Sequence, residues 1–367
     1  MAAALALARR VLGMVWPNPA VGCVLVKDGA VVARGWTQPG GRPHGEAEAL
    51  ARAGELARGA TAYVSLEPCC HWGKTPPCAE ALIAAGVARV VVPIEDPDPR
   101  MSGRGLARLK SAGIEVTTGV CAEAAATLNE GFLRRIQDGR PLITVKLAST
   151  LDGCVATKSG ESQWITGEAA RLRGHLMRAR HDAVMVGSMT VVMDDPELTC
   201  RLPGMADRSP VRIVVDGRLR VPLTAKVVAA AAKVPTWFIT LKGDAPERHQ
   251  AFRDCGVELI EVRAGTSGVD LAEAFRELGK RGLTRVLVEG GAGLVAALVR
   301  AGLVDRLAWF RAPRLIGGDG IPALAAFGLD RLADTPSFER IGIEALGEDT
   351  LETFHRGKPL GTSYLPH

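Results

Sequence analysis

The sequence predicts an α/β protein made of two domains. Its 367 residues suggest two domains, at roughly 100 to 200 residues each. Short apolar runs rich in Val, Ile and Thr alternate with stretches rich in Ala, Leu, Arg and Glu, and such alternation is typical of helices packed on a sheet. The polar, turn-forming segment 137–141 interrupts this alternation. We therefore place the boundary there and expect domains at residues 1–140 and 141–367.

The first domain contains a strong hairpin signal and a regular series of further elements. Two apolar runs, Val21–Val26 and Ala30–Gly35, flank Asp28-Gly29, a pair that favours a tight β-turn. The other expected helices are Met1–Arg10, Glu46–Ala57, Pro77–Ala85, Gly103–Ala112 and Cys121–Arg135, and the other expected strands are Ala60–Leu66, Arg89–Pro93 and Ile114–Thr118.

The second domain is expected to repeat this alternation. It starts with a strand at Leu142–Leu147, directly after the boundary, and it includes a loop at Arg201–Pro210, where proline and glycine occur. The other expected strands are Ala183–Val186, Val211–Val215, Thr236–Thr240, Val257–Val262, Arg285–Glu289 and Arg306–Ala312, and the expected helices are Glu168–Ala179, Leu271–Lys280 and Leu294–Ala301.

The composition disfavours several functional classes. Aromatic residues make up only 4% of the chain, which argues against single-strand nucleic-acid binding by base stacking. The net charge is +5 and the basic residues are scattered, which suits anionic small molecules such as phosphates better than a nucleic acid. No apolar stretch reaches the ~18 residues of a membrane span. The 8 cysteines lack the spacing of a secreted disulfide framework, so we expect a reducing cytoplasm.

Three potential metal ligands and one carboxylate form a pattern typical of a catalytic zinc site. His44 lies in a turn that opens a helix, Cys69 follows a strand, and Cys78 lies near the start of another helix. Strand ends and helix starts gather at one edge of an α/β sheet, so these side chains can converge on one ion. Three protein ligands leave a fourth position for water. Glu46 completes the H-x-E pattern of zinc deaminases, in which the glutamate moves protons and is not a ligand.

Two other interpretations of these residues stay open at this point. The histidine and cysteines could form a buried cluster without a metal, or Cys70 or His71 could be the fourth ligand of a structural zinc. The spacing between Cys69 and Cys78 also differs from the general P-C-x-x-C pattern. We favour a catalytic site because the H-x-E pattern, the flanking prolines and the helix starts coincide.

The second domain contains a glycine-rich turn between an expected strand and an expected helix. Glu289 ends the strand, and Gly290, Gly291 and Gly293 lie in the turn. Glycines let a backbone approach a phosphate, and a helix N-terminus offers unpaired N–H groups. The signal is weak, because the turn does not match the G-x-G-x-x-G fingerprint and tight packing alone can explain it.

These motifs make the chain resemble the bifunctional riboflavin-biosynthesis deaminase/reductase family over nearly its whole length. The long spacing between the two cysteine ligands is typical of that family. The segments that carry the resemblance are Pro17–Gly22, Pro43–Glu46, Leu66–Cys78, Asp96–Pro99, Leu151–Gly153, Ser159–Thr166, Asp194–Thr199 and Val288–Gly291.

The resemblance implies a cytidine-deaminase-like three-layer α/β domain followed by a dihydrofolate-reductase-like α/β domain. It also implies two successive reactions. A zinc-dependent step removes the ring 2-amino group of a diamino-ribosylamino-pyrimidinone 5′-phosphate, with Glu46 moving the protons. An NADPH-dependent step then reduces the ribosyl group to ribityl. The implied partners are small molecules, with neither nucleic acid nor membrane, and a second copy of the chain in a homo-oligomer (a dimer or a tetramer).

The resemblance also implies roles for individual residues. Zinc would be held by His44, Cys69 and Cys78, and Glu46 and Asp194 would be catalytic. The implied NADP contacts are Ala148, Trp164, Thr190, Asp194, Gly291, Ala292, Gly293, Leu294, Val295, Ala296 and Ala297. The implied substrate contacts are Asn18, Lys74, Ser162, Arg178, Leu198, Arg201 and Glu289.

Three positions depart from the residues usual in that family. Thr37 stands in place of a histidine, so the phosphate contact of that histidine is left open. Gly45 replaces an alanine beside the zinc ligand, and Cys70 replaces a serine and adds a thiol.

Two alternatives from other classes fit the sequence less well. A zinc deaminase of nucleosides or tRNA would not need the long second domain with its Ser162-Gln163-Trp164 segment. A non-catalytic zinc-binding protein would not need Glu46 next to an intact ligand set.

Overall fold

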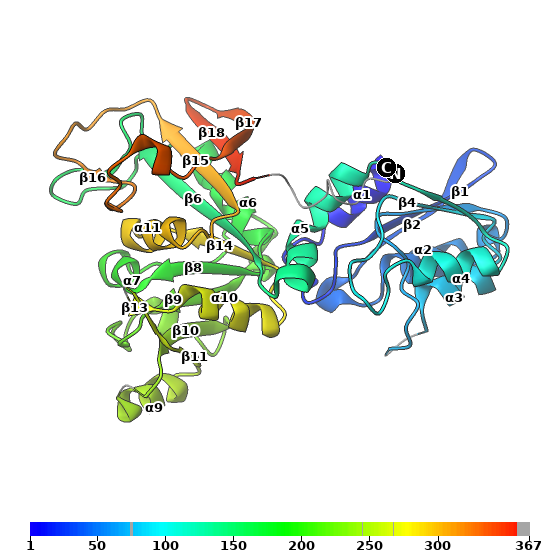
Figure 1. Ribbon diagram of the computed structural model, residues 1–367, viewed down its shortest axis with the longest axis horizontal. Helices are drawn as coiled ribbons and strands as arrows, with labels where there is room; N and C mark the ends of the chain where they lie inside the picture. The colour runs from blue at the N-terminus through cyan, green and yellow to red at the C-terminus, as the bar shows by residue number, and fades with distance from the viewer. Residues whose placement is uncertain (74–75, 244, 267, 358–367) are drawn as a thin grey trace. The chain divides into compact units, whose positions relative to one another are not determined.

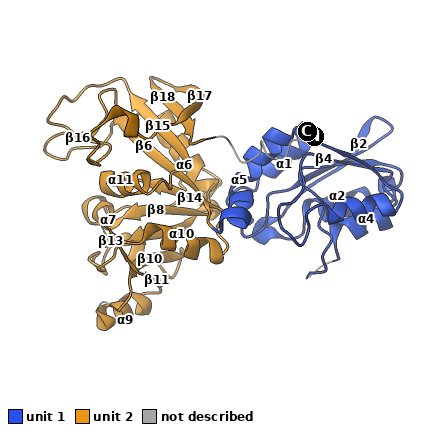
Figure 2. Cartoon of the chain, viewed as in Figure 1, with its two compact units in different colours: residues 1–139, 358–367 blue, residues 140–357 orange. Residues whose placement is uncertain are grey.

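The structure, a computed structural model, describes residues 1–73, 76–243, 245–266 and 268–357. It mixes helices and strands throughout, which confirms the predicted α/β class (Figure 1). The described chain divides into two compact units, residues 1–139 and residues 140–357 (Figure 2).

The first unit is built on one mixed sheet. Its strands are β1 (Gly22–Lys27), β2 (Ala30–Trp36), β3 (Thr61–Val64), β4 (Arg89–Val92) and β5 (Glu115–Thr118), in the order β2-β1-β3-β4-β5. β1 pairs antiparallel with β2 and β3, whereas β3, β4 and β5 are parallel. Asp28 (φ 51°) and Gly29 (φ 77°) supply the positive φ angles that the tight turn of the predicted hairpin needs.

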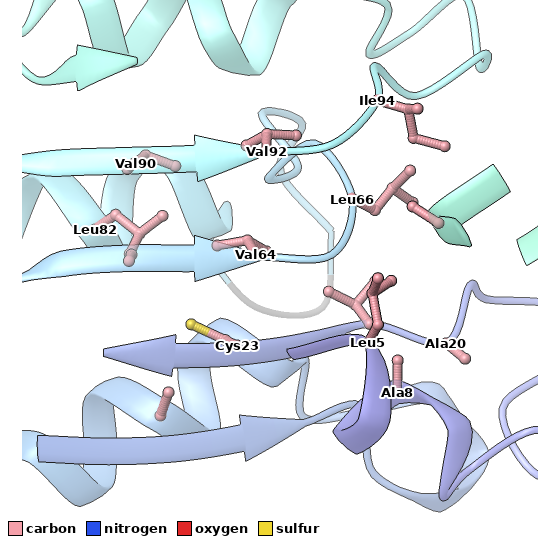
Figure 3. Packing of buried hydrophobic residues seen from close by; sticks show 14 of the residues in the cluster. Leu5, Ala8, Ala20, Cys23, Val64, Leu66, Leu82, Val90, Val92 and Ile94 are labelled. Atoms are coloured by element: carbon pink, nitrogen blue, oxygen red, sulfur yellow. The ribbon is translucent and has the colours of Figure 1, made fainter. Parts of the chain in front are cut away.

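Helices cover both faces of this sheet. They are α1 (Ala2–Arg9), α2 (Gly45–Ala53), α3 (Cys78–Ala84), α4 (Arg104–Ser111) and α5 (Ala122–Asp138). α2 contacts α3 and α3 contacts α4, whereas α1 contacts α5, which gives the expected three layers (Figure 1). Buried apolar side chains fill the space between the layers, among them Leu5, Val64, Leu82 and Val90 (Figure 3).

The second unit is built on a larger, mostly parallel sheet. Its strands are β6 (Leu142–Thr150), β8 (Ala183–Gly187), β9 (Val211–Val215), β10 (Thr236–Leu241), β11 (Glu258–Val262), β14 (Arg285–Glu289), β15 (Arg306–Ala312), β17 (Glu339–Leu346) and β18 (Asp349–His355). Their order is β11-β10-β9-β8-β14-β6-β15-β18-β17. The strands from β11 to β15 in this order are parallel, and β18 and β17 add two antiparallel pairings. Two short pairs, β7 (Cys154–Ala156) with β16 (Ile321–Pro322) and β12 (Ala264–Gly265) with β13 (Gly268–Val269), lie outside this sheet.

The helices of the second unit follow its strands. They are α6 (Glu168–Ala179), α7 (Ser188–Asp194), α8 (Lys226–Ala229), α9 (Pro246–Asp254), α10 (Leu271–Lys280) and α11 (Ala292–Arg300). β8 leads into α7 and β14 leads into α11, so both helix starts lie at the carboxyl edge of the sheet, where α/β proteins bind ligands. Within the described residues, no helix is long and apolar enough to cross a membrane.

Several elements differ from the expectation. α5 includes Gln137 and Asp138 and ends where Gly139 adopts a φ of 69°, so the predicted break at 137–141 begins later. The sequence did not predict α7, α9, β17 or β18. α7 is short and contains β-branched residues that disfavour a helix. β17 leaves most of its side chains exposed, so it has no buried face to produce a clear strand pattern.

Glu67 connects the segment after β3 to the start of α4. Its Oε2 accepts hydrogen bonds from the backbone N–H groups of Asp96 and Gly103, each at 3.0 Å, and its Oε1 accepts one from Gly105 at 2.8 Å. The side chain is only 4% exposed. A buried carboxylate is stable when donors surround it in this way. Glu67 therefore fixes the chain just ahead of Cys69.

We predict that Glu67→Gln destabilises the first unit by about 2–3 kcal/mol. In the variant, an amide nitrogen would replace Oε2, and the N–H groups of Asp96 and Gly103 would lose their acceptor. Urea unfolding followed by tryptophan fluorescence would measure the change. Glu55→Gln is the matched control, since Glu55 is exposed. Equal midpoints for the two variants would contradict this role of Glu67.

Candidate active sites

The first unit brings together the three predicted zinc ligands. His44 directly precedes α2, Cys69 follows β3, and Cys78 is the first residue of α3. The Nδ1 atom of His44 lies 3.6 Å from the Sγ of Cys69 and 3.4 Å from the Sγ of Cys78. All three ligand atoms lie within 4.8 Å of one another. Segments far apart in the sequence therefore meet at one point.

The geometry of these atoms fits a tetrahedral zinc ion. Zn–S bonds of about 2.3 Å and Zn–N bonds of about 2.0 Å place nitrogen and sulfur ligands about 3.5 Å apart. The backbone N–H of Cys78 also donates to the Sγ of Cys69 at 3.3 Å, which orients that sulfur. Cys70 does not join this group: its thiol instead donates to the carbonyl oxygen of Arg100 at 3.8 Å. Three ligands among the described residues, rather than four, favour a site with an open position.

The two predicted ligand thiols differ in acidity. Hydrogen bonding by the Cys78 thiol, helped by the His44 ring, lowers the pKa of Cys69 to about 4. The pKa of Cys78 is raised, because its thiol donates a hydrogen bond to Cys69 and is buried. The lowered pKa of Cys69 favours its thiolate, the form that binds a metal.

Glu46 lies beside the cluster with one oxygen unpaired. Its side chain is 3% exposed, and its Oε2 has no hydrogen-bond partner among the described atoms. Burial raises the pKa of Glu46 to about 7, although the charge of His44 opposes this shift. A buried oxygen without a partner is costly, so such an atom usually serves a ligand or a reaction. A carboxyl with a pKa near neutrality can both accept and release a proton.

The segments around this cluster are held tightly. The side chain of Asn18 lies against Gly41, so closely that a Cβ at position 41 would be 1.9 Å from the Asn18 Nδ2. Thr37 is buried, and its hydroxyl accepts a hydrogen bond from the backbone N–H of Val21 at 3.0 Å. Thr37 therefore supports the loop that carries Asn18 and does not offer its hydroxyl to a ligand. Lys74 lies outside the described residues.

In the second unit, Arg178 on α6 and Glu289 at the end of β14 form a two-pronged ion pair. The Nε and Nη2 atoms of Arg178 donate to the two carboxylate oxygens of Glu289 at 2.6 and 2.9 Å. Burial alone would raise the pKa of Glu289, but the charges of Arg178 and Lys146 lower it to about 2. The pair places a fixed positive and a fixed negative group at the carboxyl edge of the sheet.

Lys146 is a candidate site residue that the sequence analysis missed. It lies on the central strand β6, and its ammonium lies 5.6 Å from the ring of Phe310. Burial lowers its pKa, and the nearby charge of Glu289 opposes that shift. A lysine inside the apolar run 142–147 was the available signal, because buried lysines are rare unless they have a function or a partner.

The glycine turn of the second unit has a backbone that only glycine readily adopts. Gly290 and Gly291 have φ angles of 85° and 80°, and α11 begins at the next residue. A Cβ at position 291 would lie 3.3 Å from the Oγ1 of Thr190, so only glycine leaves this space open. Thr190 and the turn, which were predicted to contact NADP, therefore lie together. Within α11, the side chains of Val295 and Ala296 are buried, and the backbone N–H of Val295 donates to the carbonyl oxygen of Gly291 at 3.1 Å, so neither residue offers a side chain to a ligand.

The other predicted residues of the second unit are more scattered. Trp164 is exposed and stacks with Arg171, whose guanidinium carbon lies 4.8 Å from the ring centre. Leu198 is buried in the core, so its side chain is not available to a substrate. Ala148 lies on β6, and Asp194 ends α7 with an exposed side chain. Ser162 and Arg201 are exposed in loops, and no contact between them is seen.

Comparisons with known proteins identify both halves of the chain. Residues 1–94 match the model of the cytidine and deoxycytidylate deaminase zinc-binding region, and residues 141–351 match that of the RibD C-terminal domain. The riboflavin biosynthesis protein RibD of Escherichia coli is 45% identical over 95% of this chain and 96% of its own length. That of Aquifex aeolicus is 41% identical over 97% of each chain.

Solved structures give the same result. Acinetobacter baumannii RibD, form 1, is 39% identical, superimposes with a TM-score of 0.87, and covers 97% of this chain and 98% of its own. A Thermotoga maritima diaminohydroxyphosphoribosylaminopyrimidine deaminase/5-amino-6-(5-phosphoribosylamino)uracil reductase is 34% identical with a TM-score of 0.84, over 97% of each chain. The chain belongs to the RibD family of bifunctional deaminase/reductases of riboflavin biosynthesis, and it joins a zinc-binding deaminase domain to a reductase domain.

Proposed function

We propose that this deaminase and reductase acts successively on a diamino-ribosylamino-pyrimidinone 5′-phosphate. Residues 1–140 would remove the ring 2-amino group as ammonia, and residues 141–367 would reduce the ribosyl group of the product to ribityl with NADPH. The observation that carries the proposal is the convergence of His44, Cys69 and Cys78 beside the unpaired oxygen of Glu46. Family membership supplies the second activity.

In the deaminase, Glu46 would be the residue that moves protons. A bound zinc ion supplies a Lewis acid that lowers the pKa of water to about 7. Glu46 takes a proton from the attacking water and then delivers it to the departing amino group, so that one carboxyl serves both halves of the reaction. Asn18 and Lys74 would hold the substrate, Asn18 from its fixed position against Gly41.

In the reductase, the ion pair and the glycine turn would hold the two reactants. NADPH, when bound, supplies a hydride to C1′ of the open-chain sugar. Gly291, Thr190 and the start of α11 would take its phosphates, because they leave space and unpaired N–H groups. Arg178, Arg201, Glu289 and Lys146 would hold the ribosyl-phosphate substrate, with the exposed Arg201 available to its phosphate. Asp194 would position the substrate or supply a proton.

The sulfur ligands require a reducing compartment, and we expect the enzyme to work in the cytoplasm. All 8 cysteines are free, including the exposed Cys121 and the partly exposed Cys70. An oxidising compartment would convert ligand thiolates into disulfides or sulfenic acids and remove the metal.

We predict that Glu46→Gln retains zinc but lowers ammonia release by at least about 10³-fold, because the amide cannot accept the proton from water. Metal analysis by mass spectrometry and an ammonia assay on the pyrimidine phosphate test this. The reductase activity of the same variant, measured on deaminated substrate, is the internal control. Ammonia release at the wild-type rate would refute the assignment of Glu46.

A second variant tests the reductase. Desolvation by the surrounding protein raises the pKa of Asp194, and an asparagine there could no longer give up a proton. We expect Asp194→Asn to lower NADPH oxidation on deaminated substrate by about tenfold or more, with zinc content and ammonia release unchanged. Asp207→Asn, at another exposed carboxylate of the same unit, is the control. An unchanged rate would reject a role for Asp194.

We also propose that the enzyme is a homo-oligomer and that the region around β17 forms the contact between copies. Large apolar side chains are exposed on β17 and just ahead of it in the sequence: Ile341 is 50% exposed, Ile343 is 64% exposed and Leu332 is 87% exposed. β17 is also the last strand of its sheet, with an unpaired edge. Exposed apolar patches and free strand edges are typical of contacts between subunits.

Light scattering after size-exclusion chromatography tests this contact. The wild-type protein should have at least twice the mass of one chain, and Ile343→Glu should shift it towards the monomer. Leu56→Glu, at an exposed leucine of the first unit, should leave the mass unchanged. A monomeric wild type would contradict the proposal.

A further inference from the structure

One histidine of the second unit has no part in the roles described so far, although it lies among the candidate substrate residues. His175 is on α6, three residues before Arg178, so the two side chains lie on the same face of the helix. Desolvation, and then the charges of Arg178 and Arg201, lower the pKa of His175, while Glu289 opposes this. His175 therefore lies within electrostatic range of three residues proposed to hold the ribosyl-phosphate substrate.

The ring of His175 has a definite hydrogen-bond role. The backbone N–H of Arg201 donates to its Nδ1 at 3.2 Å. Because Nδ1 accepts a hydrogen bond, it carries no proton, and the neutral ring has its proton on Nε2. A protonated ring could not accept this bond. The lowered pKa favours the neutral ring that the contact needs, although a hydrogen bond with the backbone of Thr199 opposes this shift.

This contact completes the attachment of a short segment, residues 198–201, to the rest of the unit. The side chain of Leu198 is buried in the core, and its φ of 57° turns the chain sharply. The carbonyl oxygen of Thr199 accepts a hydrogen bond from the Nη1 of Arg178 at 3.0 Å. The thiol of Cys200 donates to the carbonyl oxygen of His175 at 3.6 Å. The backbone N–H of Cys200 also donates to the Oγ of Ser209 at 3.1 Å. Each residue of the segment is thus held by at least one contact.

The attachment leaves the side chain of Arg201 as the exposed part of the segment. Its guanidinium pairs with Glu197 at 3.3 Å, and the two side chains are 52% and 54% exposed. Such an exposed pair contributes little and is readily exchanged for another anion. A fixed backbone beneath an exchangeable guanidinium is suited to binding a phosphate, because less freedom is lost on binding.

We propose that His175 is a positioning residue of the reductase site, which holds the backbone of Arg201 so that its guanidinium meets the 5′-phosphate of the substrate. The inference rests on the proposed function, which assigns Arg201 to that substrate. His175 itself does not touch the reacting atoms. It acts through Arg201, so its effect must disappear when Arg201 is removed.

The test compares four forms of the full-length enzyme: wild type, His175→Ala, Arg201→Ala and the double variant. We expect His175→Ala to raise the KM for the deaminated ribosyl phosphate about tenfold, with kcat changed by less than about twofold and the KM for NADPH unchanged. The double variant should match Arg201→Ala alone, since the two residues act as one unit. The dissociation constant of the same substrate, measured by calorimetry without NADPH, should change in parallel.

A conservative variant separates positioning from general loss of structure. His175→Asn offers an amide oxygen close to the position of Nδ1, and we expect it to keep the KM within about twofold of the wild type. An unchanged kcat and an unchanged KM for NADPH report in each variant that the second unit is intact, and ammonia release reports the same for the first unit. A dephosphorylated substrate should bind wild type and His175→Ala equally.

The outcomes separate this inference from the proposed function. If Arg201→Ala raises the KM but His175→Ala does not, or if the two effects multiply in the double variant, the inference is wrong and the proposed function stands. If Arg201→Ala leaves the KM unchanged, the assignment of Arg201 to the substrate is wrong, and the inference is wrong with it.

Discussion

Both candidate sites depend on one geometric constraint: the carboxyl ends of parallel strands and the starts of the following helices meet at one edge of a sheet. In the first unit this edge brings Cys69, after β3, to Cys78, at the start of α3, and to His44, ahead of α2. In the second unit it brings the turn after β14 to Thr190 on α7. The sheet thus brings together residues that are far apart in the sequence. Each of them needs only a short loop to reach the site.

The buried carboxylates of this protein show how the same side chain serves structure or chemistry. Glu67 has both oxygens occupied by backbone N–H groups, which makes it a fixed support. Glu289 has both oxygens occupied by Arg178, so it stays ionised and holds a charge in place. Glu46 has an oxygen with no partner among the described atoms and a raised pKa. The stability lost by leaving that atom unpaired is consistent with a group that must exchange protons.

Much of the fold could be predicted because its elements have strong local patterns. α6, α10, β9, β14 and β15 have the bounds that the sequence predicts. The zinc cluster could also be predicted, since the H-x-E pattern and cysteines at helix starts and strand ends are local signals. α7 could not be predicted, because it is short and its apolar residues do not favour a helix. The missed helix includes two of the proposed reductase residues, Thr190 and Asp194.

The candidate reductase site was named only through the resemblance to the family, because its contacts are not local in the sequence. Its central contact joins Arg178 to Glu289, 111 residues later, and only the pairing of strands determines that they meet. Lys146 is similar, because a lysine in a strand ordinarily faces water, and only the folded unit shows that Lys146 is partly buried near Phe310. Residue types identify a site when the chemistry is unusual, as with two thiolates and an imidazole. Arginine and glutamate occur on every surface, so burial distinguishes a functional pair, and burial is a property of the folded chain.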